Sequence, residues 1–212
     1  MVHKKIFHTI RKSINVLILM LLIGLVIAYL TDNLGPDRIR RMQHLSGDIA
    51  LISLLISLSV TPFVTLSGIT WLGPLRKTFG LGAFYFALLH VLIYSVLDYR
   101  LDVGQILLDF RFRQYLWFGL AAFIILAVMA VTSLDKVKKA VRRVWRKIHR
   151  FVYLAGLLVV IHYALSVKGG LIFGGKPLVA LVVLVVLLVL RLPPIKKGII
   201  GLRKKVVAQA ES

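Results

Sequence analysis

The sequence predicts an all-α protein, a bundle of six transmembrane helices with both termini in the cytoplasm. Of the 212 residues, 59% are hydrophobic and 17% are charged, whereas a soluble domain of this size has about a quarter charged residues. Six apolar stretches each approach the ~20 residues that a helix needs to cross a bilayer. The Lys and Arg residues between these stretches gather on one side. This composition excludes an ordinary soluble enzyme and a disordered chain.

The six stretches are separated by Gly, Pro, Asp and charged clusters, which are typical of loops. The first follows a basic arm, is longer than a signal-peptide core and has no clear small-x-small cleavage site after it, so we expect it to be retained as a span. The last, ALVVLVVLLVL, has no polar side chain and is expected to face lipid. The stretches cover residues 14–30, 47–66, 79–97, 115–132, 151–167 and 177–192.

The charge distribution predicts the orientation and the division of the chain. Twenty of the 28 Lys and Arg residues lie in the two termini and in the loops on the same side, and eight lie in the opposite loops. Lys and Arg favour the cytoplasmic side. We therefore expect a cytoplasmic arm over 1–13, a transmembrane domain over 14–192 and a basic cytoplasmic tail over 193–212. This distribution explains most of the net charge of +20 without a nucleic acid partner. The basic segment between the fourth and fifth spans could contact membrane lipid headgroups or be a solvated cytoplasmic loop.

The side chains of the spans limit the chemistry that they can support. The chain has no cysteine, which excludes disulfides, iron–sulfur clusters and covalent haem attachment. The spans contain almost no Asp, Glu, Lys or Arg, which argues against a proton-driven transporter or a pump. Histidine is the ionisable residue that the spans do contain.

His90 and His162 are the main candidates for a functional site. His90 lies about 16 Å and His162 about 18 Å from the same membrane edge by helical rise. The third and fifth spans run in the same direction, so the two imidazoles are expected at matching depth. Two neutral imidazoles on facing helices can bind one haem iron from both sides. The alternative is two unrelated core histidines bonded to neighbouring carbonyl groups.

His149 and His44 have weaker claims. His149 precedes His162 by about 20 Å along a helix, but an ideal helix turns roughly 140° over that interval. A second pair would also need a histidine near position 77, where Arg76 and Lys77 stand. His149 could bind haem in an alternative state, line a cytoplasmic-side cofactor site or cap a helix. His44, just before the second span, could have a role on the outer side or none.

Two segments carry a family resemblance. RKTFGLGAFYFALLHVLIYSVL and WRKIHRFVYLAGLLVVIHYALSVKGG resemble the MsrQ (YedZ) family, the haem-binding membrane subunits of the bacterial periplasmic methionine sulfoxide reductase system. The similarity extends from QHLSG at 43–47 to SVK at 166–168. Three histidines and Tyr153 recur in order. The wider superfamily is the ferric reductase-like transmembrane domain.

The resemblance implies an inner-membrane b-type cytochrome that binds haem b. It implies electrons from the quinone pool or a cytoplasmic flavin reductase. The acceptor would be a periplasmic molybdopterin-containing catalytic subunit, in a heterodimer that repairs methionine sulfoxide in oxidised proteins. The haem ligands of the family correspond to His90, His149 and His162. FMN is also implied, but no flavin fingerprint is visible to place it.

In this interpretation the chain is an electron-transfer subunit with no catalytic residue of its own. It has no G-x-G-x-x-G motif after a strand, so it needs a separate electron donor. One alternative is a stand-alone ferric or cupric reductase or an oxidase-type haem domain. Another is a non-redox transporter or assembly factor, which would show no Soret band.

Overall fold

The computed structural model describes residues 2–167 and 175–210, and all regular structure within these residues is helical. The all-α prediction is therefore confirmed. The elements in chain order are α1 (Val2–Leu30), α2 (Arg38–Ser67), the 3-10 turn η1 (Thr70–Leu72), α3 (Leu75–Leu92), the π-helix η2 (Ile93–Asp98), α4 (Val103–Phe112), α5 (Tyr115–Val131), α6 (Asp135–Ala140), α7 (Trp145–Ile148), the 3-10 turn η3 (His149–Phe151), α8 (Val152–Ser166), α9 (Lys176–Val189) and α10 (Pro193–Ala210).

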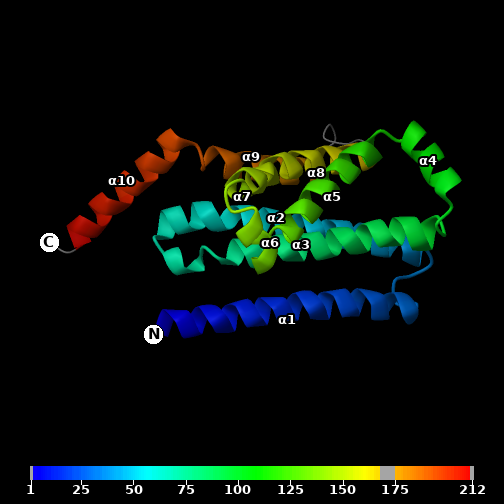
Figure 1. The fold of residues 1–212 in the computed structure, drawn as a ribbon, viewed down its shortest axis with the longest axis horizontal. Helices are drawn as coiled ribbons and strands as arrows, with labels where there is room; N and C mark the ends of the chain where they lie inside the picture. Colours follow the sequence, from blue (N-terminus) through cyan, green and yellow to red (C-terminus); the bar gives the residue numbers. More distant parts are fainter. Residues whose placement is uncertain (1, 168–174, 211–212) are drawn as a thin grey trace.

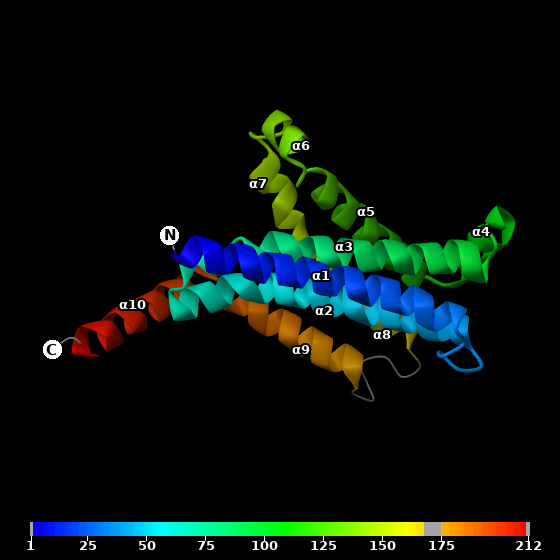
Figure 2. The same cartoon turned by 90° about the horizontal axis from the view of Figure 1, so that it is seen from below.

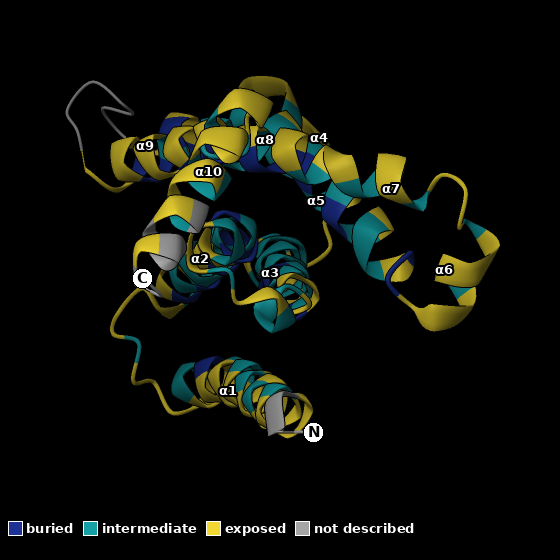
Figure 3. Ribbon diagram, turned by 90° about the vertical axis from the view of Figure 1, so that its left-hand side faces the viewer, coloured by how far each residue is buried: buried dark blue, intermediate teal, exposed yellow. Residues whose placement is uncertain are grey.

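The helices form three layers, and the α2–α3 pair is the middle one (Figure 1). α1 lies along one face of this pair, and α5, α8 and α9 lie on the opposite face, as the end-on view in Figure 3 shows. One buried cluster joins α2, α3, α5, α8 and α9 around Leu54, Leu58 and Leu184, and a second joins α1, α2 and α3 around Phe86. The beginning of α1 and the end of α10 lie at the same end of the bundle (Figures 1 and 2).

The protein is a multi-pass integral membrane protein. Among the described residues, four helices are long and apolar enough to cross a membrane, and up to six spans exist if each of two bent helix pairs is one span. α4 and α5 meet at 112°, and α9 and α10 meet at 72°. Each of the six predicted stretches coincides with one long helix: α1, α2, α3, α5, α8 or α9.

Three features differ from the expectation. α2 begins at Arg38, where the Asp37 side chain accepts a hydrogen bond from the Arg40 amide, so His44 lies inside this helix and not just before it. The expected outer loop contains α4, and the expected tail is helical over Pro193–Ala210. Short amphipathic helices of this kind have a much weaker hydrophobic signal than a span does.

Candidate functional site

His90 lies in the last turn of α3, directly before the π-helix η2. Its Nδ1 atom is 2.9 Å from the backbone oxygen of Gln43 on α2 and 3.4 Å from the Ser46 hydroxyl. A carbonyl oxygen can only accept, so the His90 Nδ1 atom carries the proton and donates it. The Nε2 atom therefore has the free electron pair that can bind a metal.

His162 on α8 is held in the same way from another helix. Its Nδ1 atom is 2.8 Å from the backbone oxygen of Tyr115, the first residue of α5. The Tyr115 ring packs against the imidazole with 5.5 Å between ring centroids. Here too the donor is Nδ1, and the Nε2 atom keeps its electron pair. Metal-binding histidines usually donate their second N–H to a carbonyl or carboxylate in this manner.

Two glycines allow these rings to lie against neighbouring helices. A Cβ atom at Gly119 on α5 would lie 2.7 Å from Nδ1 and 2.8 Å from Cε1 of His162. A Cβ atom at Gly47 on α2 would lie 3.2 Å from two atoms of the His90 ring. The observed ring positions therefore depend on the absence of a side chain at both contacts. At Gly119 an added Cβ atom would force the ring to move, whereas at Gly47 a small shift would be enough.

The structure brings His90 and His162 together. Their ring centroids are 6.2 Å apart and the ring planes are nearly perpendicular, at 86°. A metal bonded at about 2 Å to one nitrogen of each ring, on opposite sides, would hold the centroids roughly 6 Å apart. A haem iron could therefore be held between His90 and His162. Within the described residues, no group of three or more His, Asp or Glu side chains could hold a bare metal ion.

Gln43 is the neighbour that a bound iron would displace. Its side-chain amide nitrogen is 3.2 Å from His90 Nε2, the atom with the free electron pair. Its amide oxygen is buried and has no hydrogen-bond partner in the described part of the chain. An unpaired buried oxygen costs free energy, so this arrangement of the Gln43 side chain carries a penalty.

His149 is not brought to the other two histidines. It lies in the 3-10 turn η3 before α8, and its Nε2 atom is 3.3 Å from the Thr132 hydroxyl. The Trp145 ring stacks on it at 4.1 Å, and the Trp145 indole N–H donates to the Thr132 backbone oxygen. The 3-10 turn overwinds the chain locally at His149, which is the kind of departure from an ideal helix that the two histidines would need in order to point the same way.

The remaining predicted residues make no contact with the pair that the structure describes. His44 is exposed on α2. Lys168, at the end of the SVK segment, lies outside the described residues. Gln43, Gly47, Gly119 and the Tyr115 carbonyl were missed by the sequence reasoning, since nothing in the residue types themselves marks a backbone oxygen or a missing side chain as part of a site.

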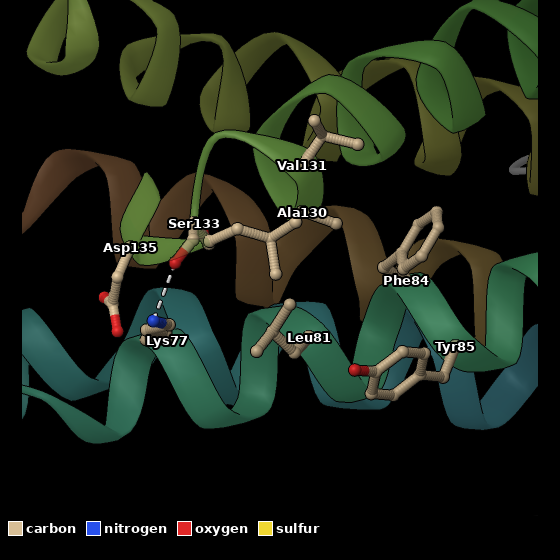
Figure 4. Close-up of a pocket in the computed structure, with 9 residues that line it drawn as sticks. Lys77, Leu81, Phe84, Tyr85, Ala130, Val131, Ser133 and Asp135 are labelled. Atoms are coloured by element: carbon tan, nitrogen blue, oxygen red, sulfur yellow. Dashed lines mark hydrogen bonds between the residues drawn. The ribbon is translucent and has the colours of Figure 1, made fainter. Parts of the chain in front are cut away.

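A cavity of about 290 Å³ lies between α3 and the turn that joins α5 to α6 (Figure 4). Phe84 and Tyr85 line one end, and Lys77 lies at the other, where its Nζ atom donates to the Ser133 backbone oxygen over 2.7 Å. Lys77 occupies the position where a second histidine pair would need its partner. Its ammonium group is engaged with a carbonyl and has no electron pair to offer a metal.

The sequence matches the family model of the ferric reductase like transmembrane component over residues 46–160. This range contains His90 and His149 and ends two residues before His162. It also contains both glycines that contact the imidazole rings.

Curated relatives match most of the chain. The protein-methionine-sulfoxide reductase heme-binding subunit MsrQ of Ralstonia nicotianae is 32% identical over 164 residues, which cover 77% of this chain and 76% of that protein. The subunit of the same name from Brucella ovis is 35% identical over 162 residues, 76% of this chain and 72% of that protein. The magnetosome protein MamZ of Magnetospirillum gryphiswaldense is 35% identical over 157 residues, 74% of this chain but 24% of that longer protein.

Proposed function

The chain belongs to the family of ferric reductase like transmembrane components, and from this premise we propose that it is a b-type cytochrome that carries electrons across a membrane. The observation that carries the proposal is the pair of neighbouring imidazoles, His90 and His162, with ring centroids 6.2 Å apart inside the helix bundle. The relatives whose printed name is heme-binding subunit support haem as the group held there.

His90 and His162 would bind the haem iron through their Nε2 atoms. A haem iron with two imidazole ligands supplies one-electron chemistry and leaves no open position for a substrate. The protein's part is to hold the rings. The Gln43 and Tyr115 carbonyls fix which nitrogen is protonated, and Gly47 and Gly119 let both rings approach the neighbouring backbones.

The surroundings of His90 keep water out. Phe86, one turn earlier on α3, has none of its surface exposed, and Ile93, one turn later, is 1% exposed. An apolar shell of this kind lowers the local dielectric and adjusts a haem potential through burial.

The partner and donors are proposed from the relatives' name and from the charge distribution. The acceptor is a periplasmic molybdopterin-containing methionine sulfoxide reductase catalytic subunit, and the donor is a quinone or a cytoplasmic flavin reductase. Both termini and the basic segment between α5 and α8 face the cytoplasm, where a donor would approach His149 and Lys77. FMN has no residues assigned to it.

The test is the optical spectrum of the purified full-length protein. We expect a low-spin Soret band that is lost for the most part in His90→Ala and in His162→Ala and is retained in His44→Ala, the exposed histidine of α2. Membrane insertion of each variant is checked by extraction and gel filtration. Full retention of the low-spin band in both His90→Ala and His162→Ala would rule out the pairing.

A second measurement addresses the acceptor. Chemically reduced protein is mixed with the periplasmic catalytic subunit or with a ferric chelate, and reoxidation of the haem is followed by stopped flow. We expect rapid reoxidation by the catalytic subunit. Fast reoxidation by the ferric chelate alone would favour a stand-alone ferric reductase, the activity named in the family description.

A further inference from the structure

A proline in α2 leaves one backbone oxygen of this helix without its usual hydrogen-bond donor. Pro62 has no N–H group, so the backbone oxygen of Leu58, four residues earlier, has no partner within the helix. The Arg191 guanidinium, just after α9, donates to this oxygen through Nη2. Its Nη1 atom donates to the Tyr153 hydroxyl over 2.8 Å, and the guanidinium lies 5.2 Å from the Tyr153 ring centroid. Arg191 therefore holds α2, α8 and α9 together.

A small cavity adjoins this arginine. It has a volume of about 150 Å³ and is lined by Thr61, Thr65, Tyr153, Arg191 and Lys196. Lys196 is exposed on α10, Tyr153 is exposed on α8 and Arg191 is half-buried. The Tyr153 hydroxyl accepts from Arg191 and still has its own proton to donate, as do hydroxyl groups in general.

Two further cations bond to threonines that line the cavity. Arg76 donates to the Thr61 hydroxyl over 3.2 Å, and Arg203 donates to the Thr65 backbone oxygen over 3.2 Å. The ion pairs found in the described part of the chain involve none of these side chains. The Arg191 Nε atom is buried and has no partner in that same part. Two cations, Arg191 and Lys196, thus line the cavity, and Arg76 and Arg203 bond to its threonines. The Thr65 hydroxyl already donates to the Thr61 backbone oxygen, so the hydroxyl groups of Thr61 and Tyr153 are the ones with a proton left to donate.

We propose that this cavity binds a phosphate group, carried by an anionic phospholipid head group or free in solution. Arg and Lys side chains with nearby hydroxyl donors are the usual ligands of phosphate. The cavity lies at the end of the bundle that holds both chain termini, and basic pockets between helices at the cytoplasmic side bind anionic lipid head groups. Its volume admits a phosphate and excludes a nucleotide. This site is separate from the His90–His162 pair and does not depend on haem.

The first test uses full-length protein in nanodiscs of phosphatidylcholine with increasing phosphatidylglycerol. The thermal unfolding midpoint of the wild type is expected to rise and saturate. In Lys196→Gln, the phosphatidylglycerol fraction at half saturation should increase about fivefold, since one cation near a lipid surface has an effect of this size. Lys196→Arg should behave like the wild type. Arg191 is left unchanged because it also pairs the Leu58 carbonyl.

The matched control is Lys197→Gln, the next residue on the same helix, which is exposed and does not line the cavity. It makes the same change of charge and should leave the half-saturation fraction unchanged. Equal effects of Lys196→Gln and Lys197→Gln would show a diffuse surface attraction and would overturn the site.

The source of the phosphate is decided in phosphatidylcholine nanodiscs, with sodium phosphate or sodium chloride at equal ionic strength. Stabilisation by phosphate in the wild type and not in Lys196→Gln identifies a site for the free anion. Stabilisation by phosphatidylglycerol alone identifies the lipid head group. The absence of both effects overturns the proposal. The Soret band should be the same in all these variants, so a missing haem would count against electron transfer and not against this site.

Discussion

At the scale of single residues, the candidate site depends on atoms that cannot be identified from the sequence. The two histidines and their spacing predicted the His90–His162 pair. Burying two ionisable side chains at matching depth in a membrane costs free energy, and a shared ligand would offset that cost. The carbonyl oxygens of Gln43 and Tyr115 could not be predicted, since every residue has one. The role of Gly119 could not be predicted either, because its missing side chain matters only where the His162 ring of another helix lies against it.

Gly119→Ala tests this point. In an exposed helix, Gly→Ala stabilises by roughly 0.5–1 kcal/mol. Here the added methyl group would lie 2.7 Å from His162 Nδ1, so the ring must move and its hydrogen bond to Tyr115 must break or lengthen. We expect most of the haem to be lost, measured as the haem-to-protein ratio of the purified variant.

The matched control is Gly24→Ala, a helical glycine of α1 whose added Cβ would have no atom within 4 Å. It should keep the full haem content. If Gly119→Ala also keeps full haem content and an unchanged low-spin spectrum, the glycine has no part in positioning His162.

His149→Ala separates the two ends of the electron path. His149 contacts Thr132 and Trp145 and lies apart from the His90–His162 pair. We expect a substantial part of the haem signal to remain, while haem reduction by a cytoplasmic donor becomes slower in stopped-flow measurements. Loss of haem as complete as in His90→Ala would instead make His149 an essential iron ligand.

At the scale of elements, the long helices follow from hydrophobicity and the short ones from specific polar contacts. The sequence predicts a loop where α4 lies, because its ten residues mix apolar, acidic and basic side chains. Its position is set by Asp109, which accepts a 3.0 Å hydrogen bond from Tyr94 and pairs with Arg113 at 2.8 Å. The Arg113 partner is an i,i+4 neighbour, a spacing that a helix pattern does predict, whereas Tyr94 is fifteen residues away in another helix and no pattern along α4 predicts it.

Asp109→Asn should loosen α4. The Asp109 side chain is only 9% exposed, so loss of its charge weakens both contacts in a partly dry environment, at a cost of about 1–3 kcal/mol. We expect faster amide hydrogen exchange over residues 103–112 and an unchanged Soret band. Arg111→Gln, on the same helix without this contact, serves as the control. Equal exchange in the two variants would show that Asp109 does not anchor α4.

At the scale of the whole molecule, the positions of the basic segments in the helix bundle agree with the charge pattern of the sequence. Both termini lie at one end, and the basic segment α6–α7 follows the end of α5, whereas α4 precedes its start (Figure 2). The sequence predicted the order of the apolar helices because each must satisfy its own backbone inside lipid, and the described part of the chain contains four to six spans where six were predicted. It could not predict how α5 crosses α3, since that angle depends on packing between residues far apart in the chain.

The orientation of this bundle in the membrane leads to the last prediction, for which the absence of cysteine is an advantage. Single cysteines can be placed at Lys139 on α6 and at Arg111 on α4, both exposed, with the wild type as an unreactive blank. Because Lys and Arg favour the cytoplasmic side, a membrane-impermeant maleimide added to spheroplasts should label Arg111→Cys and not Lys139→Cys. Inverted inner-membrane vesicles should show the opposite. Labelling of Lys139→Cys from the outside would place the basic segment in the periplasm and would put His149 and Lys77 on the side of the electron acceptor.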